Sequence, residues 1–109
     1  MTKEFTLRAV LTVLTGRLWC VFQELHQLLE WMEGGAVFTH NIPDCLDKYE
    51  PYLEEQFPEL EEVVNNIRNL EVSRVDLMNP RYIMDCIEAA ERDHGVMCNV
   101  YSKEQSDES

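Results

Sequence analysis

Apolar residues recur at helical spacing over most of the chain, and the N-terminal third contains two such segments. The first begins at Thr6, a residue type that caps helix N-termini, and ends at Gly16, a residue type that terminates helices. The second covers residues 22–33 and stops at a pair of glycines. The pattern predicts two amphipathic helices joined by residues 17–21. Their apolar stripes are formed by Leu7, Val10, Leu11 and Leu14 in the first, and by Phe22, Leu25, Leu28, Leu29 and Met32 in the second.

The middle of the chain keeps the helical period but is interrupted by prolines. Residues 36–41 lack the period and predict an extended loop or a short strand. Pro43 marks the first turn of a third helix, inside which Pro51 removes a backbone donor and predicts a kink or a split. Pro58 stands at the first position of a fourth helix. The apolar positions of these two helices are Leu46, Tyr49, Leu53 and Phe57, then Leu60, Val63, Val64, Ile67 and Leu70.

One more helix is predicted near the C-terminus. The alternating apolar residues within 71–78 form too short a run for a strand, so this segment is predicted to be a connector. Asn79 and Pro80 follow it as the N-cap and the first-turn residue of the last helix. The helix ends at His94 and Gly95. Its buried face is predicted to consist of Ile83, Cys86, Ile87 and Ala90.

The remaining residues predict a small amount of β structure. Residues 96–101 have strand character and are expected to pair with an extended segment near Trp19 or Val37. Residues 102–109 are polar and acidic and predict a disordered tail. The expected fold is mainly α, with α+β as the alternative. We expect one globular domain over residues 1–101, a compact bundle of four to five short helices with at most a two- or three-stranded sheet.

Charge is the most unusual feature of the composition. The 109 residues include 21 acidic and 9 basic side chains, a formal net charge of -12. The electric field of this net negative charge repels nucleic-acid phosphates and anionic lipids and attracts basic proteins. We therefore expect no direct binding to nucleic acid or membranes. No signal peptide or long apolar run is visible, which predicts a cytoplasmic protein. Free thiols are therefore expected at Cys20, Cys45, Cys86 and Cys98.

The acidic residues are densest between residues 44 and 62, where Lys48 is the single basic residue. A helical pair with so many carboxylates imitates the spaced negative charge of a nucleic-acid backbone and suits a basic groove on another protein. The alternative is a solvated acidic face without a partner. The residues predicted to contact a partner are Asp47, Glu50, Glu54, Glu55, Glu61 and Glu62, together with Tyr49 and Tyr52.

A second candidate for binding is the compact polar and aromatic loop formed by Phe38, Thr39, His40 and Asn41. A capping role for Thr39 or Asn41 is the structural alternative. A metal site would have to use His40, Cys45 and neighbouring carboxylates, because neither Cys-x-x-Cys nor His-x-x-x-His spacing occurs. The sequence therefore predicts no catalytic residues, no metal ligands and no cofactor, and a small metal-dependent enzyme or metal-binding module stays as an alternative.

Several short motifs resemble a family of small uncharacterised proteins from bacteriophages and prophages. The similar segments are residues 11–18, which end in Thr15-Gly16-Arg17-Leu18, and the Phe38-Thr39-His40-Asn41-Ile42-Pro43 element, with a further match in Tyr49-Glu50-Pro51-Tyr52. The sequence departs from that pattern at Leu14, Glu33 and Asp44, where threonine, threonine and arginine are usual. The resemblance implies a phage or prophage origin and a location in the bacterial host cytoplasm. It implies no activity, substrate or catalytic residue.

These observations predict a phage-encoded, non-enzymatic interaction protein that inhibits or modulates a host protein. The expected partner has a basic surface, and a nucleic-acid-binding complex such as a bacterial defence complex is the leading candidate, which would make the chain an anti-CRISPR-like acidic mimic. A phage accessory or structural component, with self-association into a homo-oligomer, is the remaining alternative.

Overall fold

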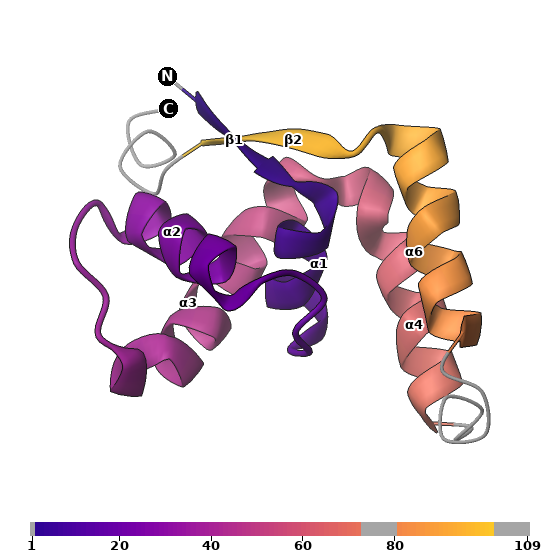
Figure 1. The fold of residues 1–109 in the computed structure, drawn as a ribbon, viewed down its shortest axis with the longest axis horizontal. Helices are drawn as coiled ribbons and strands as arrows, with labels where there is room; N and C mark the ends of the chain where they lie inside the picture. Colours follow the sequence, from indigo (N-terminus) through magenta and orange to yellow (C-terminus); the bar gives the residue numbers. More distant parts are fainter. Residues whose placement is uncertain (1, 73–80, 102–109) are drawn as a thin grey trace.

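The computed structural model describes residues 2–72 and 81–101. These residues form five α-helices, two short 3-10 helices and a two-stranded antiparallel sheet, so the predicted mainly α fold is confirmed (Figure 1). The elements in chain order are β1 (Thr2–Thr6), α1 (Leu7–Thr15), α2 (Phe22–Glu33), η1 (Thr39–Asn41), α3 (Ile42–Gln56), η2 (Pro58–Leu60), α4 (Glu61–Val72), α6 (Arg81–His94) and β2 (Met97–Tyr101).

Helix α1 lies at the centre of the molecule. It contacts α2, α3 and α4 and both strands, and seven of its nine residues are buried. The predicted ends are confirmed: the Thr6 hydroxyl accepts a hydrogen bond from the Ala9 N–H at 3.2 Å, and Gly16 ends the helix with φ 77°. The buried Thr12 hydroxyl donates to the Arg8 carbonyl at 2.8 Å, which satisfies a polar group inside the core.

Helices α2 and α3 pack against each other and against α1. In α2 the predicted stripe is buried except for Phe22, which is 48% exposed and stacks on His26 instead. Helix α3 continues past Pro51, so the predicted split is wrong. Pro51 lies on the exposed face, where water can bond the carbonyl that loses its helical partner. The start of α3 is preceded by η1, so no strand forms within residues 36–41.

The sheet joins the two ends of the described chain. Strand β2 is confirmed, but it pairs with β1 in a register that sets Phe5 opposite Cys98 and Lys3 opposite Val100. The predicted pairing near Trp19 or Val37 is therefore wrong. The N-terminal strand contains one buried apolar residue, Phe5, and such a segment lacks the alternation that identifies a strand from sequence.

Helices α4 and α6 lie side by side at one end of the molecule (Figure 1). The helix predicted from Pro58 begins as η2 and continues as α4. Helix α6 buries Ile83, Ile87 and Ala90 as expected, whereas Cys86, predicted on the same face, is half-buried. The first two residues of the connector predicted at 71–78 belong to α4 instead. The rest of that connector, the Asn79–Pro80 cap and the tail at 102–109 lie outside the described residues. Among the helices that are described, none combines the length and the apolar character needed to cross a membrane.

Candidate functional site

The predicted contact carboxylates lie on the outward sides of α3 and α4. The 3.6-residue period directs Ile42, Cys45 and Leu53 into the core and leaves acidic positions facing solvent. Asp47 and Glu54 are seven residues apart, so they lie on one line of α3, about 10 Å apart along its axis. We define the acidic surface as Asp47, Glu50, Glu54, Glu55, Glu61 and Glu62, of which all but the half-buried Glu50 are exposed.

Glu50 is the member of the acidic surface that has a cationic partner. Its carboxylate lies 3.0 Å from the Arg68 guanidinium. Within residues 2–72 and 81–101, the other five carboxylates form no ion pair or side-chain hydrogen bond. Their negative charge is therefore not neutralised by an ion pair within the described residues, so it is available to a basic partner.

The two tyrosines of the predicted contact set have different environments. Tyr49 is 0% exposed, and its hydroxyl donates to the Glu33 carboxylate, which also pairs with Lys48 Nζ at 3.2 Å. Burial raises the pKa of Tyr49 to about 12, and the bond to Glu33 adds to the effect. Tyr52 is half-buried, with its ring centroid 6.0 Å from that of Tyr49. Tyr49 is thus a core residue that cannot contact a partner directly.

A cleft of about 280 Å³ lies beside the acidic surface, where the ends of α1 and α3 meet η2 and α4. Glu54 from α3 and Glu61 from α4 both line it, so the tertiary structure places two carboxylates of the predicted contact set at one cleft. Its other lining residues are Leu14, Phe57, Pro58, Val64, Asn65 and Arg68. The cleft therefore combines four apolar lining residues with two exposed acids, an asparagine and an arginine.

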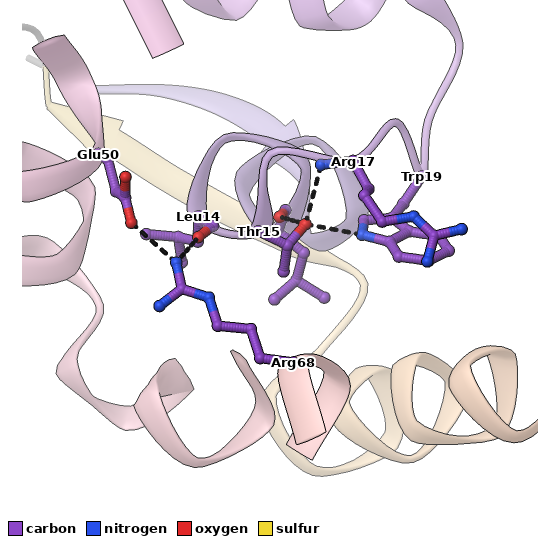
Figure 2. Close-up of polar contacts among 7 residues, drawn as sticks. Leu14, Thr15, Arg17, Trp19, Glu50 and Arg68 are labelled. Carbon is purple, nitrogen blue, oxygen red and sulfur yellow. Dashed lines mark hydrogen bonds and ion pairs between the residues drawn. The ribbon is translucent and has the colours of Figure 1, made fainter. Parts of the chain in front are cut away.

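Arg68 connects this cleft to the end of α1. Its guanidinium donates to the Leu14 carbonyl at 2.8 Å and to Glu50 at 3.0 Å, as Figure 2 shows. The last carbonyls of a helix lack helical partners and carry partial negative charge, so a guanidinium is a suitable donor. Arg68 was not predicted as a site residue, because only the fold places it opposite a helix terminus.

The turn after α1 is held by the Thr15 hydroxyl. This hydroxyl donates to the Leu11 carbonyl at 2.7 Å and accepts from Trp19 Nε1 at 2.9 Å and from the Arg17 N–H at 3.3 Å (Figure 2). The Arg17 guanidinium lies 4.9 Å from the Trp19 ring centroid and 3.3 Å from Glu71 on α4. The Thr-Gly-Arg segment singled out in the sequence is thus a folded turn with an internal polar network.

The predicted loop site lies at the opposite end of α3. Phe38 is 64% exposed and its ring stacks on His40 at 5.9 Å, while Thr39 is exposed and Asn41 is half-buried. A second, more open cleft of about 210 Å³ runs along this region, but Asn41 is the only one of the four loop candidates that lines it. The loop therefore presents an exposed aromatic pair rather than a closed pocket.

The described residues contain no group of three or more His, Cys, Asp or Glu side chains that could hold a metal ion. His40 is exposed against Phe38, whereas Cys45 is buried. All four cysteines are free thiols. Burial raises the pKa of Cys20, of Cys45 and of Cys98, the last to about 11, which keeps these thiols protonated and poorly nucleophilic near neutral pH.

Comparison with family models identifies one match. The model described as a domain of unknown function, DUF7736, matches residues 5–63, which is more than half of the chain. The chain belongs to the DUF7736 family. Comparison with curated proteins and with solved structures gave no significant match.

The DUF7736 segment covers helices α1 to α3 and all of the predicted site residues. It runs from the end of β1 through α1, α2 and α3 to the start of α4, and it contains both the acidic surface and the Phe38–Asn41 loop. Arg68 lies beyond the DUF7736 segment. The cleft is therefore built by residues inside the segment and by three from the α4 residues that follow it: Val64, Asn65 and Arg68.

Proposed function

We propose that this chain is a non-enzymatic interaction protein whose acidic surface binds a basic groove on another protein. The observation that carries the proposal is the set of five exposed carboxylates, Asp47, Glu54, Glu55, Glu61 and Glu62, which have no cationic partner among the described residues. Unpaired surface charge of one sign attracts an oppositely charged partner over long range and raises its association rate.

The spacing of these charges suits imitation of nucleic acid. Asp47 and Glu54 are separated by about 10 Å along α3, which is close to the axial rise of about three phosphates along one DNA strand. The net charge of -12 adds a field of the same sign over the whole molecule. A protein groove that binds a phosphate backbone would accept such a helix, and the bound helix would exclude the nucleic acid.

The biological setting in this proposal comes from the resemblance to phage and prophage proteins. The chain is proposed to be phage-encoded and to act in the cytoplasm of the bacterial host. Its proposed target is a basic nucleic-acid-binding complex, such as a defence complex, which it inhibits by occupying the nucleic-acid groove.

The test is affinity capture from host lysate, followed by mass spectrometry, with the parent chain and two matched variants. The first variant changes Glu54, Glu55, Glu61 and Glu62 to glutamine. The control variant removes the same four charges elsewhere, at Glu4, Asp85, Glu88 and Asp93, all exposed. We expect the parent and the control to recover the same basic protein at low salt. Binding by the first variant should be at least about tenfold weaker, from several exposed charge pairs of a few tenths to one kcal/mol each.

Two results would contradict the proposal. One is recovery of no basic partner by the parent chain at either low or moderate salt. The other is equal loss of binding in both variants, because the effect would then follow net charge and not the acidic surface. Circular dichroism and size-exclusion chromatography of each variant show that the fold and the oligomeric state are retained.

A further inference from the structure

The cleft beside the acidic surface is lined by four apolar residues and four polar ones, two of which are acidic. Leu14 and Val64 are buried, and Phe57 is half-buried, so the interior of the cleft offers hydrocarbon contacts. Glu54 and Glu61 are exposed and come from two different helices that meet there. A volume of about 280 Å³ lies just below the usual range for small-molecule sites, about 300 to 1,000 Å³, so it suits one long side chain.

Among the described residues, Arg68 is the one cation that lines the cleft, and its charge is compensated by Glu50. It donates to the Leu14 carbonyl and to Glu50, which lies on the same helix as Glu54. The C-terminal end of α1 adds partial negative charge at this point. The local electrostatic environment therefore favours a second cation in spite of Arg68.

We propose that the cleft is the anchor point for one arginine or lysine side chain of the basic partner. The methylene stem of that side chain lies against Leu14, Phe57 and Val64, and its cationic group reaches Glu54 and Glu61. Long basic side chains bury their stems on apolar surface while keeping the charge in a polar setting. Arginine in a partly desolvated pocket is a common source of binding energy at protein interfaces. This assignment rests on the proposed function and adds the position of its principal contact.

The first measurement is an NMR titration of the labelled chain with a blocked pentapeptide, Gly-Ser-Arg-Ser-Gly. The control peptide replaces arginine by citrulline, which has nearly the same shape without the charge. We expect the arginine peptide to shift the backbone amides of Glu54, Glu61 and Asn65, and the citrulline peptide to leave them unchanged. Shifts centred on residues outside the cleft, or equal shifts with both peptides, would overturn the assignment.

The second measurement compares two double variants of equal charge. Glu54→Gln with Glu61→Gln removes both acids of the cleft, whereas Asp47→Asn with Glu62→Gln removes two acids of the same surface that do not line it. We expect the dissociation constant of the arginine peptide to rise about three- to tenfold in the first variant and less than about twofold in the second. Equal effects in the two variants would overturn the anchor but leave the proposed function intact.

A third variant tests the cleft without changing charge. Asn65 is exposed and lines the cleft, so Asn65→Trp places a large side chain in it while all six carboxylates remain. We expect loss of the peptide-induced shifts in a chain that stays folded, as judged by the dispersion of its spectrum. Retained peptide binding by this variant would show that the arginine side chain of the peptide binds elsewhere. The capture experiment would still test the acidic surface independently.

Discussion

Side chains of α2 and α3 form hydrogen bonds with backbone groups at the edges of the small sheet. The Glu24 carboxylate on α2 accepts hydrogen bonds from the Thr6 N–H at 2.9 Å and from the Thr6 hydroxyl at 2.7 Å. The Gln56 amide at the end of α3 accepts from the Tyr101 N–H at 2.9 Å and donates to the Tyr101 carbonyl at 3.0 Å. Backbone groups that a two-stranded sheet leaves open are thus bonded to helices, which ties each strand to the core.

A buried tyrosine links the stability of the fold to pH. The Tyr49 hydroxyl is buried and donates to Glu33, and its pKa is raised from 10.0 to about 12, first by burial and then by that bond. The neutral form is favoured in the folded state. Its contribution to stability is therefore complete below pH 10 and is lost as the pH rises through about 12.

We predict that the parent chain loses stability relative to Tyr49→Phe as the pH rises from 10 to about 12, by about 2 kcal/mol. Phenylalanine cannot ionise, so it removes this linkage, although it also loses the bond to Glu33 at every pH. Urea denaturation of both proteins over a pH series measures the difference. The control is Tyr82→Phe, because the Tyr82 side chain is exposed. Its stability should change with pH in the same way as that of the parent chain. Parallel pH profiles for the parent and Tyr49→Phe would show that Tyr49 does not carry this effect.

At the scale of elements, α1 depends on its ends because it is short. Nine residues make about two and a half turns, and isolated helices of that length are unstable in water. Burial on nearly all sides and the caps at Thr6 and Gly16 compensate for the length. The last turn of α1 also supplies the Leu14 carbonyl to Arg68, so the end of this helix contributes directly to the wall of the cleft.

We predict that Gly16→Ala lowers the free energy of unfolding by about 1 to 2 kcal/mol. Gly16 has φ 77°, a conformation that L-residues disfavour, and a Cβ there would meet no atom within 4 Å, so the effect comes from the backbone alone. Gly35→Ala is the matched control, because Gly35 lies in equally open space without a positive φ, and its stability should change little. Equal effects of the two substitutions in urea denaturation would refute the backbone explanation.

In the whole molecule, α1 is the central helix and lies between two pairs of helices. Helices α2 and α3 contact it on one side and α4 on another, with α6 packed along α4 (Figure 1). The acidic surface spans the two sides, since it includes residues of both α3 and α4. The same arrangement that forms the cleft therefore also concentrates charge of one sign, which favours unfolding by self-repulsion.

We predict that the melting temperature rises by a few degrees when ionic strength increases from about 0.01 M to about 0.15 M. Over that range the screening length falls from about 30 Å to about 8 Å, which weakens repulsion among the exposed carboxylates. The variant with glutamine at 54, 55, 61 and 62 should melt at a higher temperature than the parent at low salt and respond less to added salt. Calorimetry measures both effects, and a parent melting temperature that is flat or falls with salt would contradict the prediction.

The main helices and the exposure of most of the acidic residues could be predicted from local sequence patterns. Local features include the helical spacing of apolar residues in α2, α4 and α6 and the caps at Thr6, Gly16 and Gly34. They are local because helix hydrogen bonds and caps join residues a few positions apart. Exposure of Glu54, Glu55, Glu61 and Glu62 follows from the same period, since charged side chains avoid the core.

Contacts between residues that are distant in the sequence could not be predicted and are known from the tertiary structure. Strand β1 has little strand signal of its own and forms because β2, at the other end of the described chain, pairs with it. Tyr49 was predicted both on the apolar face of its helix and in the contact set, and the structure buries it, with its hydroxyl donating to Glu33 on α2. Arg68 reaches the end of α1, and Glu54 and Glu61 share one cleft, only because α3 and α4 both pack on α1. Such contacts depend on packing between elements, which the local pattern of apolar and polar residues does not encode.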